Sequence, residues 1–485
     1  MLLKALAFAA AVAPALATDN DKVYKHVVTF SVDGLHGSDV EKYVAKRPDS
    51  TIATLLKTAY EYTDCYTSAP SDSYPGVAAF VSGADPRTTG IWYDDTYDRS
   101  FWSPYSTTGT NCSGPPGAEV TYDETKDYDS TKVWSGGIDP ANLPQSIIGR
   151  KCTWTYPHQR IRVNTIYEIV EASGKQTAYT DKHPAYDMVR GPSGKGLSVG
   201  YFPEIQAFDT TNLTQIIGYD QMHVNSWLAW INGTSLVNSE VQDPLTGIPT
   251  LFGGNFQAVS VGQKTYGYVA GSLDFTPELL RALDFVDNSI GQVVSALKTK
   301  GVFDDTLIIV ASKHGQAPID PTLYNKVDQA LLPPAIKVPV AFITTDDIGL
   351  VFLVDARDTD AAVDNLNGQR DALKIDDIIS GDRLTYLGYG DPSTDPAVPN
   401  IIIKPKLGTI YTTSTSKIAE HGGLSDDDRK VACFASATNI ERTVFNHQVF
   451  TKEFAPTILQ ALGLDPMSLQ GVVAEGGKVI DGFRG

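Results

Sequence analysis

Residues 306–315 read TLIIVASKHG, an apolar run that ends abruptly in a lysine, a histidine and a glycine. A second run, residues 27–34, reads VVTFSVDG and ends in an aspartate and a glycine. Continuous runs rich in β-branched residues are typical of central parallel strands that are covered on both faces. Helical three-to-four spacing appears in residues 52–59, 165–173 and 277–300. This alternation predicts an α/β fold: a doubly wound, mostly parallel sheet with helices on both faces.

The chain has 485 residues, 42% of them hydrophobic, which is enough to bury one large core. We therefore expect one α/β domain over residues 18–485. Residues 320–417 break the strand–helix rhythm with Pro- and Asp-rich turns, so we expect an inserted cap there. Ligand sites in such sheets lie beyond the carboxyl ends of the strands. Asp33, Lys313 and His314 are expected to meet at that rim.

Residues 1–17 combine an early lysine, a short apolar stretch and a small-residue cleavage pattern, which predicts a secretory signal. The apolar stretch is shorter than the roughly 20 residues that span a bilayer, so we expect no membrane span. Three Asn-x-Ser/Thr sequons agree with a secreted, extracellular glycoprotein: Asn111, Asn212 and Asn232.

Four cysteines are too few to hold a chain of this length by a disulfide framework. Cys112 and Cys152 flank a polar, turn-rich stretch and form the favoured bridge. Cys65 and Cys433 lie in apolar runs and are either buried thiols or a second pair.

The net charge of −18 argues against a polyanionic partner. Binding of nucleic acid is driven by clustered Lys and Arg, and the sequence shows no such cluster. We expect no nucleic-acid-binding surface.

Four residues have patterns that suit chemistry. Asp33 follows a buried strand and could hold a cation or cap the next helix. Ser73 precedes Pro75, which favours the first turn of a helix, where free N–H groups attract a phosphate or sulfate; the serine could equally be an N-cap. His314 and His421 each precede a glycine at a strand boundary, which favours metal ligands.

Taken in order, these segments resemble the alkaline phosphatase superfamily, and most closely its type I phosphodiesterase and nucleotide pyrophosphatase branch. The similar segments are Asp33-Gly34, Ser73-Tyr74-Pro75-Gly76, Thr88-Thr89-Gly90-Ile91, His314-Gly315, His421-Gly422 and Ala455-Pro456-Thr457-Ile458-Leu459.

The resemblance implies a small anionic substrate, such as a phosphodiester or nucleotide, opened by a threonine or serine nucleophile with two zinc ions. By motif, Ser73 would be the nucleophile. Asp33 and His314 would bind one ion, and His421 the other.

Lys313 departs from this pattern, because the family has an aspartate ligand at its position. A lysine ammonium cannot ligate while protonated, and a divalent ion beside it would be repelled by several kcal/mol at an effective dielectric of about 20. Val259 and Gln263 occupy the positions of two further ligands, and Asp94 that of a phosphate-contacting asparagine. The sequence therefore predicts fewer than two ions, either one zinc or other divalent cation, or none.

Three interpretations follow. In the first, Lys313 replaces an ion and holds the anionic group, while Asp33, His314 and Asp94 organise Ser73, with or without one metal. Lys313 could instead form a structural ion pair with Asp33 or Asp94.

In the second interpretation, Asp181 and His183, in a loop after an expected strand at residues 176–179, rebuild a metal site; the loop could also be a salt-bridged turn. In the third, the pocket binds an anion without catalysis. His36 either enters the same pocket or lies in a surface turn.

We expect a secreted phosphoester hydrolase, similar to phosphodiesterases or nucleotide pyrophosphatases, with a degenerate metal centre. A sulfatase-like hydrolase is the alternative enzyme, although Ser71-Asp-Ser-Tyr-Pro-Gly lacks the arginine of the sulfatase motif. A non-catalytic anion-binding member of the superfamily is the alternative without chemistry.

Overall fold

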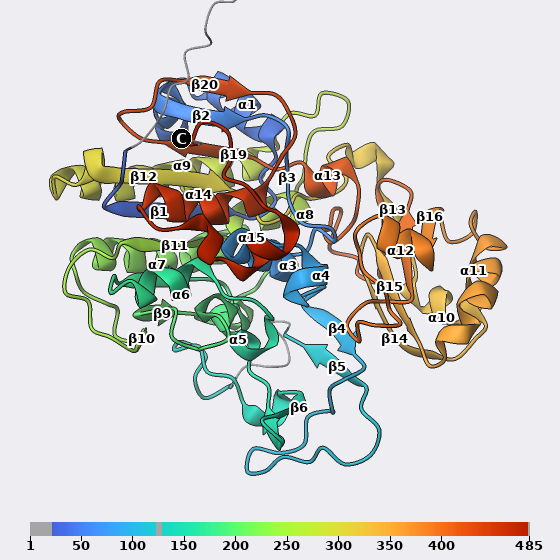
Figure 1. The fold of residues 1–485 in the computed structure, drawn as a ribbon. Helices are drawn as coiled ribbons and strands as arrows, with labels where there is room; N and C mark the ends of the chain where they lie inside the picture. Colours follow the sequence, from blue (N-terminus) through green and yellow to red (C-terminus); the bar gives the residue numbers. More distant parts are fainter. Residues whose placement is uncertain (1–21, 123–128, 484–485) are drawn as a thin grey trace, which may run out of the picture.

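The computed structural model describes residues 22–122 and 129–483 (Figure 1). The expected signal segment, residues 1–17, lies outside the described residues. A nine-stranded sheet runs in the order β10-β9-β8-β11-β1-β12-β19-β2-β20. Its strands are β1 His26–Val32, β2 Ala59–Tyr62, β8 Thr177–Thr180, β9 Val199–Tyr201, β10 Glu240–Val241, β11 Leu251–Phe256, β12 Thr306–Ala311, β19 Cys433–Ser436 and β20 Thr443–Phe445.

Strand β1 is parallel to both of its neighbours, β11 and β12. The pairs β8–β9, β8–β11 and β2–β20 are also parallel, whereas β19 is antiparallel to β12 and β2, and β10 is antiparallel to β9. The prediction of a mostly parallel sheet is confirmed. The two apolar runs form its central strands, where side chains are buried on both faces of the sheet.

Alternating residues of the central strands enter different cores. Val27 and Leu307 pack into one hydrophobic cluster, whereas Val28 and Ile308 pack into another. The first cluster includes residues of α3 Ser73–Ser82, α6 Ile166–Ala172 and α14 Phe454–Ala461. The second includes residues of α7 Leu213–Ile231, α8 Ala258–Thr265 and α9 Pro277–Thr299. Helices therefore cover both faces of the sheet, as a doubly wound fold requires.

The expected helix at residues 52–59 is shorter in the structure. Helix α2 covers Thr51–Leu55, a single 3-10 turn follows at Leu56–Thr58, and Ala59 already begins β2. The apolar spacing continues through Ala59 because that residue is also buried, but its burial is part of strand β2 and not of a helix.

A second, smaller sheet lies beside the main one (Figure 1). It has four antiparallel strands in the order β14-β15-β17-β16. Their bounds are β14 Val340–Thr345, β15 Gly349–Leu353, β16 Ile375–Ser380 and β17 Ile401–Pro405. One face of this sheet packs with Trp92 and Tyr93, which follow α3 in the chain. That residues 320–417 act as a cap over the site stays a prediction.

Two disulfides are present, Cys112–Cys152 and Cys65–Cys433. The side chains of all three sequon asparagines, Asn111, Asn212 and Asn232, are exposed. Over residues 22–122 and 129–483, no helix is both long and apolar enough to cross a bilayer.

Candidate active site

Lys313 lies at the rim of the sheet between two carboxylates. Strands β1 and β12 run side by side in the same direction, so Asp33 and Lys313 leave them at the same edge. The Lys313 Nζ atom lies 3.4 Å from Asp33 Oδ2 and 3.3 Å from Asp181 Oδ1. All three side chains are buried. Sequence reasoning considered the pairing with Asp33, but not the pairing with Asp181.

Two amides and a tyrosine ring complete the surroundings of this ion pair. Gln257 Nε2 donates to Asp33 Oδ2. In the orientation that satisfies its hydrogen bonds, the Asn255 amide donates to Asp33 Oδ1 at 2.7 Å and accepts from Lys313 Nζ at 3.3 Å. The centre of the Tyr186 ring lies 4.4 Å from Nζ, a cation–π contact. The ammonium therefore has partners on several sides.

The two carboxylates differ in acidity. Burial alone would raise the pKa of Asp33, but the positive charges of Lys313 and His314 outweigh it and hold this pKa well below its ordinary value. Burial raises the pKa of Asp181; Lys313 opposes that shift and Asp33 reinforces it. Asp33 is therefore the more acidic of the two carboxylates beside Lys313.

Ser73 is the first residue of α3, and Asp72 is its N-cap. Asp72 Oδ2 accepts from the N–H groups of Tyr74 and Asp94, each at 3.1 Å. Ser73 is thus not the N-cap, which was one of its sequence-based interpretations. Its Oγ is buried and makes no hydrogen bond with the part of the chain that the structure describes.

Close backbone contact brings α3 onto the loop after β12. A Cβ atom on Gly76 would lie 2.1 Å from the carbonyl oxygen of Lys313, so only glycine permits this approach. Thr67 Oγ1 donates to the same carbonyl at 2.6 Å. The first turn of α3 is therefore packed directly against the residue that carries the ammonium.

The two histidines stack. The His314 and His421 ring centroids are 3.7 Å apart and the rings are inclined by only 7°. His314 Nε2 lies 3.5 Å from Asp33 Oδ2, and His421 Nε2 lies 3.6 Å from Asp72 Oδ1. The stacked rings link the carboxylate at the end of β1 to the residue just before Ser73.

The surroundings of His421 favour its neutral form. Burial, followed by the charges of His314 and Lys264, lowers the pKa of His421 well below its ordinary value. Glu420, whose Oε1 lies 3.1 Å from His421 Nδ1, opposes that shift. Glu420 is itself paired with Lys264 and Lys417.

Two other candidate residues, His183 and Asp94, have contacts outside this ion pair. His183 Nδ1 pairs with Glu204 rather than with the carboxylate of Asp181. Asp94 Oδ1 accepts from the N–H of Asp95 at 2.7 Å.

The two residues expected at further family ligand positions are neutral and make structural contacts. Val259 is buried in the second hydrophobic cluster, and Gln263 Nε2 donates to the Gly34 carbonyl oxygen at 2.8 Å. Among the described residues, no group of three or more His, Cys, Asp or Glu side chains could hold a metal ion. The residues at this rim do not fit a two-zinc centre.

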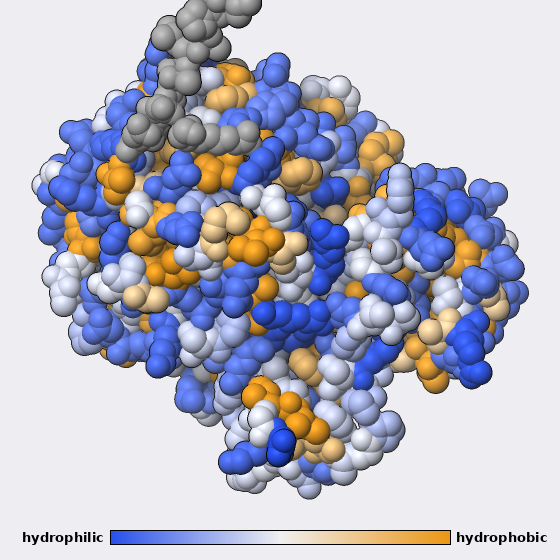
Figure 2. All heavy atoms as spheres, in the orientation of Figure 1, coloured by the Kyte–Doolittle hydropathy of each residue, from blue (hydrophilic) through white to orange (hydrophobic). Residues whose placement is uncertain are grey.

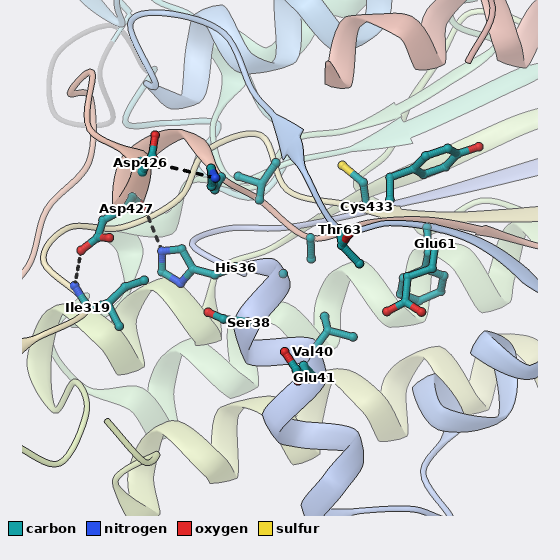
Figure 3. Close-up of a pocket in the computed structure, with 16 residues that line it drawn as sticks. His36, Ser38, Val40, Glu41, Glu61, Thr63, Ile319, Asp426, Asp427 and Cys433 are labelled. Atoms are coloured by element: carbon teal, nitrogen blue, oxygen red, sulfur yellow. Dashed lines mark hydrogen bonds and ion pairs between the residues drawn. The ribbon is translucent and has the colours of Figure 1, made fainter. Parts of the chain in front are cut away.

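His36 lies in a separate hollow (Figure 3). This cavity of about 350 Å³ is lined by residues of α1 Gly37–Lys46, β2 and α13 Asp426–Arg429, and by His36 itself. His36 Nδ1 pairs with Asp39 Oδ2 at 2.8 Å, and Nε2 contacts the Asp427 carbonyl oxygen at 2.9 Å. Neither Asp33 nor Ser73 lines this cavity, so His36 does not share their site.

Sequence reasoning missed Asp72, Glu420, Asn255 and Gln257. Asp72 carried a usable signal, because an aspartate two residues before a first-turn tyrosine is a standard N-cap pattern. The other three meet the site only through tertiary packing.

A family model described as type I phosphodiesterase / nucleotide pyrophosphatase matches residues 27–423. Among solved structures, murine ectonucleotide pyrophosphatase / phosphodiesterase 5 is similar at 13% identity, covering 91% of this chain and 96% of that chain, with a TM-score of 0.59. An inactive variant of the murine protein, solved in complex with AMP, matches equally well. A mutant of alkaline phosphatase PafA is similar at 15% identity over 94% of this chain and 98% of its own, with a TM-score of 0.61. A search of curated protein sequences finds no match.

Proposed function

The chain belongs to the type I phosphodiesterase / nucleotide pyrophosphatase family, and from this premise we propose that it is a secreted phosphoester hydrolase with Ser73 as its nucleophile. The family and the alkaline phosphatase-like fold support cleavage of a phosphoester bond. The two disulfides are compatible with secretion. The AMP complex of the murine relative favours a nucleotide as the substrate class.

One observation carries the proposal: the Oγ atom of Ser73 is buried at the rim and makes no hydrogen bond within the described ranges. His314 Nε2, in contrast, lies 3.5 Å from Asp33 Oδ2. Buried polar atoms are nearly always hydrogen-bonded, so the serine hydroxyl calls for a water, an ion or a ligand. An anionic phosphoryl group over the first turn of α3 would supply acceptor oxygens to that turn and place phosphorus near the serine.

In the proposed reaction, Ser73 Oγ attacks phosphorus and the bond to the leaving alcohol oxygen breaks. The serine proton is transferred to that oxygen, so the alcohol leaves and Ser73 carries the phosphoryl group. Water then attacks phosphorus, the Oγ–P bond breaks, and Ser73 regains a proton. Lys313 offsets the charge of Asp33, which would otherwise repel the phosphoryl group. No step requires a metal ion.

The test is hydrolysis of a generic aryl phosphodiester and of a nucleotide diester by purified protein. We expect Ser73→Ala to lower kcat/KM by at least about 10³-fold while leaving the thermal midpoint nearly unchanged. Ser82→Ala is the matched control, because Ser82 lies on the same helix and its Oγ bonds only the Ala78 carbonyl oxygen at 2.6 Å.

Equal rates for Ser73→Ala and the wild type would refute the assignment of the nucleophile. Absence of turnover in the wild type, combined with saturable binding of AMP, would favour a non-catalytic anion-binding protein. Faster cleavage of an aryl sulfate than of the aryl phosphodiester would favour the sulfatase-like alternative.

A further inference from the structure

A small lobe projects from the main body on the side away from β20 (Figure 1). It consists of residues 101–117 and the antiparallel hairpin formed by β6 Gln145–Ile148 and β7 Lys151–Trp154, and we call it the hairpin lobe. The disulfide Cys112–Cys152 joins its two parts. Trp102 and Gln145 also exchange two backbone hydrogen bonds of 2.8 Å. The lobe is therefore cross-linked rather than a loose loop.

The tip of the hairpin lobe exposes large apolar side chains. Ile147 is 55% exposed and Ile148 is 47% exposed, and Tyr105 in the adjoining segment is 61% exposed. Figure 2 shows a hydrophobic patch on this projection. Ile147 and Ile148 follow one another on β6, so their side chains lie on opposite faces of the hairpin, on either side of its tip. Exposed apolar side chains gathered on a protrusion mark an interaction surface.

The charge of the lobe is opposite to that of the rest of the protein. Residues 101–117 and 143–155 contain two charged residues, Arg150 and Lys151, and no acidic residue, in a chain whose net charge is −18. Both side chains are exposed, and neither forms an ion pair with a residue that the structure describes. The lobe thus carries two uncompensated positive charges directly beside Ile147 and Ile148.

Arg150 has a left-handed backbone conformation, which is unfavourable for an arginine. Gly149 has φ 57° and Arg150 has φ 69°, which defines a turn with both central residues left-handed. Glycine or asparagine is favoured at the second of these positions. Turn stability therefore does not explain the arginine.

Aromatic side chains surround the base of the tip. Trp102 and Trp154 are half-buried, and their Nε1 atoms donate to the carbonyl oxygens of Gly114 and Ser106, each at 3.1 Å. The tip thus has apolar residues, cations beside them and aromatic residues behind them. This arrangement suits the boundary between lipid headgroups and acyl chains.

We propose that the hairpin lobe docks the protein onto a membrane surface that contains anionic phospholipid. Ile147 and Ile148 would enter the acyl boundary, and Arg150 and Lys151 would contact headgroup phosphates. The acidic body does not prevent this, because charges more than about 8 Å from the surface are largely screened at physiological ionic strength. Pairing of two lobes in a dimer is a poorer alternative, since it would bring like charges together. This inference does not depend on the reaction proposed for Ser73.

The experiment is co-sedimentation of the full, secreted protein with vesicles of phosphatidylcholine alone and of phosphatidylcholine with 30% phosphatidylserine, at about 0.15 M salt. We expect binding to the anionic vesicles. Arg150→Glu/Lys151→Glu should lower the partition coefficient there by at least about tenfold, and Ile147→Ser/Ile148→Ser by at least about fivefold. Because Asn111 lies on the lobe, the measurement is repeated with Asn111→Gln.

Two matched variants alter similar side chains elsewhere. Val237→Ser changes a fully exposed valine, and Lys195→Glu/Lys406→Glu reverses two exposed lysines outside the lobe. Both are expected to bind as the wild type does. The proposal would be overturned if these controls lost as much vesicle binding as the lobe variants, or if the wild type bound neither kind of vesicle. Concentration-dependent dimerisation that the isoleucine variant abolishes, without vesicle binding, would assign the lobe to a second copy instead.

Discussion

Two halves of the rim differ in charge. In the first half, Lys313 places a positive charge between Asp33 and Asp181, with His314 beside Asp33. In the second half, Val259 is packed in a hydrophobic cluster and Gln263 bonds a backbone carbonyl oxygen. The first half therefore holds a cation among carboxylates, whereas the two named residues of the second half are neutral. If the family's ions were bound at both places, the first half would have kept the positive charge of an ion and the second half would not.

The largest expected effect comes from removing the charge in the first half. Lys313→Met would leave Asp33 and Asp181 buried beside each other without a cation, and we expect the free energy of unfolding to fall by about 3–5 kcal/mol. Urea denaturation measures this. Lys313→Arg retains the charge and should lose less stability. If Lys313→Met were as stable as the wild type, the ammonium would not be stabilising these buried carboxylates.

A smaller effect concerns Asp346, in the turn after β14, which lies outside both halves and is influenced by the charges of Glu420 and Asp72. Burial, and then the negative charge of Glu420, raises the pKa of Asp346 to about 8. The folded protein thus holds a proton that the unfolded chain releases near its ordinary pKa of 3.8. Stability should fall as the pH rises through this interval, by at most about 1.4 kcal/mol per pH unit, and level off above pH 8.

Asp346→Asn removes this titration, so its free energy of unfolding should change less between pH 6 and pH 8. The difference between the two proteins is expected to be about 2 kcal/mol, measured by urea denaturation at both pH values. Identical pH profiles would show that Asp346 is ionised in the folded state.

The smallest expected effect concerns the contact between Tyr186 and Lys313 in the first half of the rim. Tyr186→Leu keeps an apolar side chain but removes the ring 4.4 Å from Lys313 Nζ, and we expect a loss of about 1 kcal/mol. Tyr186→Phe is the control and should retain most of the stability. If both variants lost the same amount of stability, the hydroxyl, which both lack, rather than the cation–π contact would explain the loss.

The sequence was sufficient for the parts of the molecule that depend on local pattern. The runs that end before Asp33 and Lys313 are largely apolar and rich in β-branched residues, so their places as central strands could be predicted. The pairing of Lys313 with Asp181 could not, because the loop after β8 reaches the rim only through the order of strands in the sheet. The same holds for Asp346, which comes from the second sheet.

His183 illustrates the converse case. It lies two residues from Asp181, and the sequence pattern predicts a pair of ligands, whereas in the structure its Nδ1 pairs with Glu204, which is buried with it. Proximity in sequence predicts a shared loop, whereas a shared site depends on side-chain directions that tertiary packing fixes.

The most direct test of the central idea, that the Lys313 ammonium occupies the place of an ion, is the zinc content of purified protein by elemental analysis. We expect the wild type to contain no stoichiometric zinc. Lys313→Asp should gain at most one equivalent, because Val259 and Gln263 cannot ligate a second ion. One or more equivalents of zinc in the wild type would contradict this assignment.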